Sequence, residues 1–397
     1  MVEISKRIQQ MAPSGTVEMS QKVREMQSQG RDVISLSVGE PDFATPLAVK
    51  EAAVAAIRED KANHYTAATG IVPLKKAIID FHNRKDGLDY ELNQVAVFSG
   101  AKFTLYTAFQ TLLDPGDEVL IPAPYWVSYT EQIKLAQGTP VIVETNYEDN
   151  FKVTVQQLEA QRTDKTKILL LTSPSNPTGT FYTRDELTTL GQWAVDNDLL
   201  IISDEIYYEL MYDNHHSVSI ASISPEVQAH TLIVNGLSKS SAMTGWRVGY
   251  ALGDAGLIKA MADLTTHTTG NLASVSQYAA IAALSSDNDA AKEEMRQKFE
   301  DRLELFYPLI SEIPGFKCHK AGATFYLFVD VTEAAKRCGY DSVRDFCMAI
   351  LEEAEVALVS GDDFGAPDYL RFSFATSDDL LVESARRIKT FVESKWK

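Results

Sequence analysis

Cysteines and long apolar runs are scarce in this 397-residue chain, and their scarcity excludes several classes of protein. No run approaches the roughly 18 apolar residues that a membrane-spanning helix needs. Residues 1–7 lack the apolar segment of a signal peptide. The three cysteines, Cys318, Cys338 and Cys347, form no Cys-x-x-Cys pair, and their odd number argues against a disulfide framework. These absences predict a cytoplasmic protein.

Basic residues are also few. The 37 Lys and Arg residues face 55 Asp and Glu residues, which gives a formal net charge of −18. Such a chain repels phosphates, so neither nucleic acid nor an anionic membrane is expected as a partner. No Gly-x-Gly-x-x-Gly opens the first strand–helix unit, which argues against a nicotinamide dehydrogenase. No metal site is predicted, and an anionic ligand would have to be held by a few well-placed cations.

The middle of the chain alternates between strand and helix patterns. Hydrophobic residues make up 45% of the sequence, enough for a large interior, and the length suits two or three domain-sized units. Several strands are continuous Val, Ile and Leu runs, which indicate a mainly parallel sheet with helices on both faces. The predicted strands are 95–98, 118–121, 139–144, 167–172, 199–203 and 231–234, and the predicted helices between them include 102–112, 126–136 and 184–197.

The two ends of the chain differ from this middle part. Strands predicted at 324–329, 356–359 and 369–374 are mixed with helices, as in a smaller α+β unit. The N-terminal segment, with two helices before residue 32 and a short strand at 33–36, is assigned to the same unit. We therefore expect an α/β protein with a large domain at 46–290 and a small domain made of 1–45 and 291–397.

The stretch from Gly236 to Gly249 carries the strongest chemical signal. Lys239 follows the apolar run 231–234, so it is expected on a loop just beyond a buried strand. Its neighbours are small, and Arg247 lies farther along the same loop. A lysine there can form a Schiff base with an aldehyde if its amine is easily deprotonated. From local sequence alone, a solvated loop lysine is an equal alternative.

Other polar residues follow predicted strands, at the edge of the sheet where ligands of open α/β folds bind. Asp204 and Tyr207 follow strand 199–203, and Asn176 follows strand 167–172. Asp204 could instead cap a helix, and Asn176 could belong to a tight turn. Ser99-Gly100-Ala101-Lys102 joins a strand to a helix, and N–H groups at such a helix start form an anion site.

Together these sequence motifs resemble those of the class I (fold-type I) aminotransferases, which use pyridoxal 5'-phosphate. The resemblance runs from about residue 33 to 376 and is closest to bacterial aspartate aminotransferases, the subgroup that also includes aspartate/prephenate aminotransferases. It implies the fold-type I transferase architecture. The matching phrases are Gly39-x-Pro-Asp-Phe, Tyr65-x-x-x-x-Gly, Pro-Tyr-Trp126-Val-Ser-Tyr, Asn176-Pro-x-Gly, Asp204-Glu-x-Tyr and the segment from Lys239 through Arg247 to Gly249.

The resemblance implies a role for each of these residues. Lys239 would hold the cofactor covalently and act as the general base, Asp204 would pair with the pyridine nitrogen, and Tyr207 would hydrogen-bond the phenolic oxygen. The remaining cofactor-binding residues would be Gly100, Ala101, Lys102, Trp126, Asn176, Arg247 and Tyr65. Tyr65 would reach the cofactor of a neighbouring subunit, which implies a homodimer. Without the family context, Tyr65 would be a packed surface aromatic, and Trp126 a core aromatic.

The resemblance also implies a substrate site formed by Gly39, Trp126, Asn176, Arg371 and Lys102. Arg371 would clamp the α-carboxylate of an amino acid, for which a planar guanidinium is suited. Lys102 would pair with a distal carboxylate, which favours aspartate, with 2-oxoglutarate as the acceptor in a ping-pong reaction. A strand arginine facing water, a solvated first-turn lysine and a plain turn glycine at position 39 are the alternatives.

Three other functions stay open at this point. An aromatic or broad-specificity aminotransferase, or a pyridoxal-phosphate β-lyase or decarboxylating enzyme on the same fold, would share the cofactor motifs. The aminotransferase-like module of a transcription regulator is disfavoured, because no basic helix-turn-helix extension precedes residue 30 and the net charge opposes DNA binding.

Overall fold

A seven-stranded sheet lies at the centre of the larger part of the molecule. The computed structural model describes residues 2–9, 11–12 and 15–397, and within them the strand order of this sheet is β2-β8-β7-β6-β5-β3-β4. Strand β8 runs in the opposite direction to the other six, so the predicted mainly parallel α/β sheet is confirmed. The strands are β2 (Val95–Phe98), β3 (Glu118–Pro122), β4 (Thr139–Val143), β5 (Thr166–Thr172), β6 (Leu200–Asp204), β7 (Thr231–Gly236) and β8 (Gly249–Leu252).

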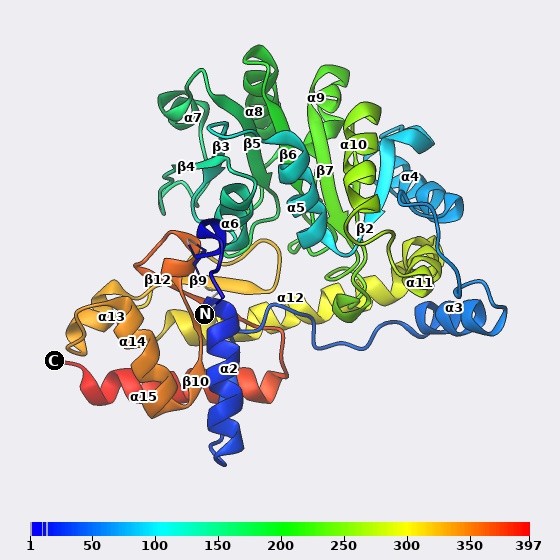
Figure 1. Cartoon of the computed structure of the whole chain (residues 1–397). Helices are drawn as coiled ribbons and strands as arrows, with labels where there is room; N and C mark the ends of the chain where they lie inside the picture. Colours follow the sequence, from blue (N-terminus) through cyan, green and yellow to red (C-terminus); the bar gives the residue numbers. More distant parts are fainter. Residues whose placement is uncertain (1, 10, 13–14) are drawn as a thin grey trace.

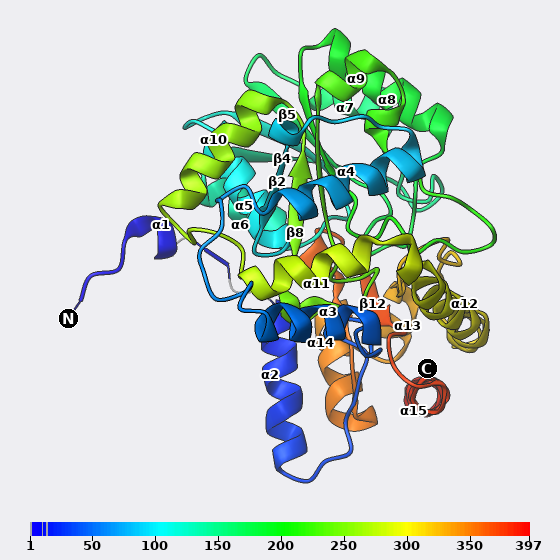
Figure 2. The same cartoon turned by 90° about the vertical axis from the view of Figure 1, so that its right-hand side faces the viewer.

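Helices cover both faces of this sheet (Figure 1). Side chains alternate across each strand, so Phe98 packs on one face and Val97 on the other. The first face carries α5 (Ala101–Leu112), α6 (Ser128–Leu135) and α10 (Ala255–Thr266), and the second carries α4 (Val72–Asp86), α7 (Val155–Gln161), α8 (Arg184–Asp196), α9 (Pro225–Ala229) and α11 (Ser274–Leu284). Helix α3 (Leu47–Arg58) packs along α11 (Figure 2). None of the helices in the described ranges is long and apolar enough to span a membrane.

The smaller part contains two short sheets. Strands β11 (Val359–Ser360), β12 (Tyr369–Ser373) and β9 (Tyr326–Asp330) are antiparallel, whereas β1 (Ile34–Ser35) pairs in parallel with β10 (Val356–Ala357). The single strand predicted at 356–359 is therefore wrong. The chain changes partner at Leu358, whose side chain enters the main core of this part, while Val359 packs in a separate cluster. The helices here are α2 (Gly15–Ser28), α13 (Thr332–Arg337), α14 (Val343–Ala349) and α15 (Asp378–Lys395), whereas α1 (Lys6–Gln9) projects away from them (Figure 2).

The apolar cores follow this division. One cluster joins Ile34 and Leu36 to buried side chains between Met295 and Val392, and the turn after β6 contributes Tyr207 to it. The clusters around the seven-stranded sheet draw on residues between Val49 and Leu284. On this basis we propose the domain division that the sequence suggests, with a large domain at 46–290 and a small domain made of 1–45 and 291–397.

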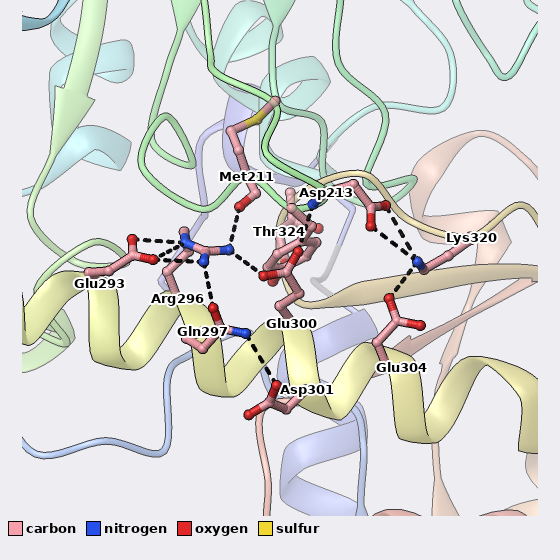
Figure 3. Close-up of polar contacts among 11 residues, drawn as sticks. Met211, Asp213, Glu293, Arg296, Gln297, Glu300, Asp301, Glu304, Lys320 and Thr324 are labelled. Atoms are coloured by element: carbon pink, nitrogen blue, oxygen red, sulfur yellow. Dashed lines mark hydrogen bonds and ion pairs between the residues drawn. The ribbon is translucent and has the colours of Figure 1, made fainter.

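The long helix α12 (Asp289–Ser311) is tied to the segment that follows β6 (Figure 3). Arg296 donates to the carbonyl of Met211 at 3.1 Å and pairs with Glu300 at 2.7 Å. The backbone N–H of Asp213 donates to Glu300 at 2.6 Å, and Lys320 lies 3.4 Å from the Asp213 carboxylate. Isolated surface pairs contribute little, but a linked network holds several groups in one geometry. The helix thereby restrains the chain just beyond the turn that carries Tyr207.

Candidate active site

A pocket of about 450 Å³ lies where β5, β6 and β7 end and the smaller part of the chain covers the sheet. Ten residues predicted from the sequence line it: Gly39, Ala101, Lys102, Trp126, Asn176, Asp204, Tyr207, Lys239, Arg247 and Arg371. Gly100 lies directly against Arg247. Tyr65 does not line the pocket and is 96% exposed. The chain thus brings all of the predicted residues except Tyr65 to one place.

Lys239 follows β7, on a segment of small residues that lets its side chain reach the pocket. Its Nζ donates to the carbonyl of Gly39 at 2.5 Å and lies 6.0 Å from the ring centre of Tyr207. Burial lowers the pKa of Lys239 to about 8; Glu40 opposes this shift, and Arg371 and other cations add to it. A substantial fraction of the amine is therefore neutral near pH 8, as a nucleophile or a general base requires.

Asp204 is the last residue of β6 and is 3% exposed. Its Oδ2 accepts a hydrogen bond from the hydroxyl of Tyr129 at 2.7 Å, and its Oδ1 accepts one from the Ile206 N–H at 3.2 Å. Burial raises the pKa of Asp204 to about 6, and these two hydrogen bonds limit the rise. The carboxylate therefore ionises near neutral pH in a buried position, where a cationic N–H group would be a favourable partner.

Tyr129 is a site residue that the sequence analysis missed. Its hydroxyl lies 2.7 Å from Thr172 as well as from Asp204, so it links β5, β6 and α6. Its ring packs edge-on against Trp126. The spacing gives a signal, because in the predicted helix 126–136 Tyr129 lies about one turn after Trp126 and so on the same side. The predicted helix start at Trp126 is wrong by two residues, since α6 begins at Ser128.

Two further polar groups share the pocket wall with Asp204. The hydroxyl of Tyr207 lies 2.9 Å from the hydroxyl of Tyr326, a second residue that the sequence did not reveal. Asn176 uses its Oδ1 to accept from Arg371 at 3.0 Å. That bond orients the amide and leaves its N–H groups available to donate to a ligand. The pair supplies donors that suit an anionic oxygen on a ligand ring.

Arg371 lies on β12 and is 2% exposed, so the alternative that it faces water is wrong. Its guanidinium donates to the carbonyl of Ser37 at 2.9 Å and lies 4.4 Å from the ring centre of Tyr326. Its Nε is buried without a partner, and no carboxylate of the described residues pairs with it. An unpaired buried cation is costly, so this arrangement fits a site that receives an anion.

The start of α5 is a second place in the pocket whose geometry suits an anion. Gly100 has φ of +89°, and a Cβ added to it would lie 2.3 Å from Nη2 of Arg247. Only glycine therefore allows the guanidinium to lie against the first turn of α5, where backbone N–H groups are free of helical partners. Cation and helix terminus converge on the same space, as a phosphate group requires.

Lys102 follows in the first turn of α5. Its Nζ lies 4.8 Å from the ring centre of Trp126, a cation–π contact. Burial, and then the charge of Arg247, lower the pKa of Lys102. It has no acidic partner among the described residues. Within the described part of the chain, the pocket therefore holds two cations besides Arg371 that lack a carboxylate partner, Lys102 and Arg247.

The sequence profile of the family described as aminotransferase class I and II matches residues 31–388. The chain belongs to this family. It is 49% identical over 390 residues to a protein of Bacillus sp. (strain YM-2) named aspartate aminotransferase, covering 98% of this chain and 99% of that relative. It is 46% identical to a protein of Streptococcus mutans named asparagine–oxo-acid transaminase, covering 99% of this chain and all of the relative.

The fold agrees with this assignment. The solved structure of an aspartate aminotransferase from Thermus thermophilus with maleate has a TM-score of 0.93 to this chain at 37% identity, and covers 98% of this chain and 100% of the other. The protein is thus a pyridoxal-phosphate-dependent aminotransferase of fold type I, acting on an amino acid and a 2-oxo acid. The residues present fit the cofactor, since the cradle at Gly100 and Arg247 suits its phosphate and the amine of Lys239 suits its aldehyde.

Proposed function

We propose that this aminotransferase transfers the amino group of L-aspartate to 2-oxoglutarate in a ping-pong reaction. The observation that carries the proposal is that Arg371 and Lys102 line the pocket without a carboxylate partner in the ranges that the structure describes, in addition to Arg247, which is assigned to the phosphate. A dicarboxylic substrate supplies one carboxylate to Arg371 and one to Lys102. The names of the Bacillus and Thermus proteins, and maleate, itself a dicarboxylate, support the same substrate class.

Pyridoxal phosphate supplies an aldehyde that takes up the amino group and a ring that withdraws electrons from the substrate's α-carbon. We propose that Lys239 holds the aldehyde, Asp204 holds the ring nitrogen, and Tyr207 and Asn176 donate to the phenolic oxygen. Trp126 would stack on the ring. The phosphate would lie among Gly100, Ala101, Lys102 and Arg247, with Tyr65 reaching it from a second subunit.

Side chains of this protein then bind the substrate and move its α-proton. Arg371 holds the α-carboxylate and Lys102 the distal one, beside the Gly39 backbone, and two fixed points orient the α-hydrogen. The Nζ of Lys239 takes the α-proton, because its lowered pKa leaves a substantial fraction of the amine unprotonated near pH 8. The ionised Asp204, held by Tyr129, keeps the ring nitrogen protonated throughout.

Lys239→Ala tests the central assignment. We expect no turnover, and we expect borohydride trapping of the wild-type holoenzyme to leave the adduct on the peptide that contains Lys239. Lys259→Ala is a matched control, because Lys259 pairs with Asp263 on α10, away from the pocket residues. Near-normal activity of Lys239→Ala, or an adduct on another lysine, would overturn the assignment.

A half-reaction screen tests the substrate. The holoenzyme is mixed with single amino acids, and the loss of its visible absorbance is followed. We expect aspartate and glutamate to react much faster than phenylalanine, and Lys102→Gln to reduce this preference. A faster reaction with phenylalanine would refute the role of Lys102, and release of pyruvate and ammonia from cystathionine would favour a β-lyase.

Asparagine is the second candidate donor, because a 46% identical relative carries that name. The distal amide of asparagine is neutral, so it gains little from the charge of Lys102. The same screen separates the two donors. If the holoenzyme reacts faster with aspartate than with asparagine, and Lys102→Gln abolishes this difference, aspartate is supported as the donor. If it reacts faster with asparagine, asparagine is supported.

We further propose a homodimer. Several large apolar side chains on and beside α3 and α4 are exposed, and Tyr65 is the most exposed of them: Leu47 65%, Val54 42%, Ile57 53%, Val72 51% and Tyr65 96%. Burial of such side chains favours association. Sedimentation should give a dimer, and Tyr65→Phe should weaken cofactor binding. A monomer with full activity would refute both. We also propose the cytoplasm as its location, which cell fractionation tests.

A further inference from the structure

A buried polar cluster lies behind the candidate active site, on the opposite side of β6 from the pocket. We call it the acid cluster: His82 and Asp86 on α4, Glu205 and Tyr208 just after β6, and Ser219. The side chains of His82 and Asp86 are 0% and 3% exposed, and Glu205 is 1% exposed. None of the three lines the pocket. The proposed reaction therefore leaves these titratable groups without a role.

Ser219 joins the two carboxyl groups of the acid cluster. Its hydroxyl donates to Oε1 of Glu205 at 2.7 Å, and its backbone N–H donates to Oδ1 of Asp86 at 3.3 Å. The hydroxyl of Ser203 donates to the same Oε1 at 2.9 Å, and the hydroxyl of Tyr208 donates to Oδ1 of Asp86 at 2.6 Å. One oxygen of each carboxyl group is thus well satisfied.

The other oxygen of each carboxyl group is not. Oε2 of Glu205 and Oδ2 of Asp86 are buried without a hydrogen-bond partner, as is Nδ1 of His82, which lies 3.7 Å from that oxygen of Asp86. Two ionised carboxylates linked by one serine would place two negative charges in an apolar interior. A protonated Glu205 avoids this cost.

The acid cluster and the pocket hold the same short turn from opposite sides. Side chains alternate at the end of β6, so Asp204 faces the pocket while Ser203 and Glu205 face the acid cluster. In the turn that follows, Ile206 and Tyr207 line the pocket and Tyr208 bonds Asp86. The two groups proposed to hold the cofactor ring are therefore interleaved with two groups fixed from behind.

We propose that the acid cluster positions Asp204 and Tyr207, and that its Glu205 carries a proton at neutral pH. This proposal rests on the proposed roles of Asp204 and Tyr207. Burial, and then the charge of Asp86, raise the pKa of Glu205 to about 8, and Ser219 and Ser203 limit the rise. The titratable groups that surround Glu205 are His82 and Asp86 on α4, Tyr90 beyond it, Asp204 on β6, Tyr208 and Glu209 after it, and Tyr250 on β8.

The protonation state has a consequence for the pocket. A neutral Glu205 leaves Asp204 as the one negative charge at the end of β6, so that Asp204 ionises near neutral pH. An ionised Glu205 would repel that charge and raise the pKa of Asp204 further. Glu205 is thus a positioning residue that acts through its neighbour. The basic groups nearby do not neutralise it, since Lys292 pairs with Glu209 at 2.9 Å.

Three variants test the proposal. Glu205→Gln keeps the shape, the neutral charge and an acceptor oxygen for both serines, whereas Glu205→Ala removes them. Glu209→Gln is a matched control on the same segment, outside the pocket. The first readout is the infrared carbonyl band of a protonated carboxyl group in the apoprotein at pH 7. We expect Glu205→Gln to lose this band and Glu209→Gln to keep it. An absent band, or one that survives in Glu205→Gln, would overturn the proposal.

The second readout is the cofactor affinity and the kcat of the holoenzyme. We expect Glu205→Gln to retain wild-type cofactor affinity and kcat, and Glu205→Ala to lower both by at least about tenfold, as loss of a buried hydrogen-bonding group does. If Glu205→Gln lowers cofactor affinity and kcat as much as Glu205→Ala does, the proposal that Glu205 is neutral is refuted. Because the infrared band is measured without cofactor or substrate, its result does not depend on whether the proposed reaction is correct.

Discussion

Replacing Asp204 by Asn should stabilise the apoprotein while it damages the holoenzyme. The pKa of Asp204 is about 6, against an ordinary value of 3.8. A raised folded-state pKa means that the folded form is penalised once the group ionises, so the carboxyl costs nothing below pH 4 and its full penalty applies above pH 6. At about 1.4 kcal/mol for each pKa unit, that penalty is about 3 kcal/mol.

Asn removes the charge and keeps the contacts. Its oxygen can accept from the Ile206 N–H, and its amide can donate to the hydroxyl of Tyr129, which can turn to Thr172. Urea unfolding of both apoproteins should therefore give the variant an advantage of up to about 3 kcal/mol at pH 8 and about half that at pH 5. Cofactor affinity and kcat should both fall. An equal or lower stability at pH 8, or an advantage independent of pH, would refute the reasoning.

Three further substitutions probe the pocket. Tyr129→Phe removes a hydrogen bond to Asp204, so cofactor affinity in an absorbance titration should fall about tenfold, and an unchanged affinity would contradict the contact. Arg371→Lys keeps the charge but not the fork of donors, so KM for aspartate should rise about tenfold to a hundredfold in steady-state assays with cofactor affinity unchanged. Gly100→Ala places a Cβ 2.3 Å from Arg247, so cofactor dissociation in equilibrium dialysis should rise at least about tenfold; a normal constant would exclude this cradle.

The sequence predicts the sheet well because its strands are buried on both faces, and burial leaves continuous apolar runs. Such apolar runs do not indicate the direction of a strand or which strands it pairs with. Strand β8 is as apolar as its neighbours, yet it runs antiparallel between β2 and β7. Residues 356–359 are uniformly apolar, and their division between two sheets depends on which core each side chain enters.

The site residues could be predicted where a motif fixes them and not where a contact between distant elements creates them. Tyr326 meets Tyr207 across 119 residues of chain, and no local pattern indicates that contact. Arg371 has apolar neighbours on both sides, so alternation along its strand cannot tell whether it faces inward. The proposed residue roles stay predictions until the variants are measured.

The cations of the pocket serve two purposes in a chain with a net charge of −18. Arg371, Arg247 and Lys102 are placed to bind anions, and each also helps to lower the pKa of Lys239. Their combined field attracts an anionic cofactor and substrate into a protein that would otherwise repel them. Burial first, and then the same field, lower the pKa of Lys239 to about 8, so a substantial fraction of its amine is neutral near pH 8 before those anions arrive. Arrival of a phosphate or carboxylate compensates the field, so the pKa of Lys239 should rise on binding.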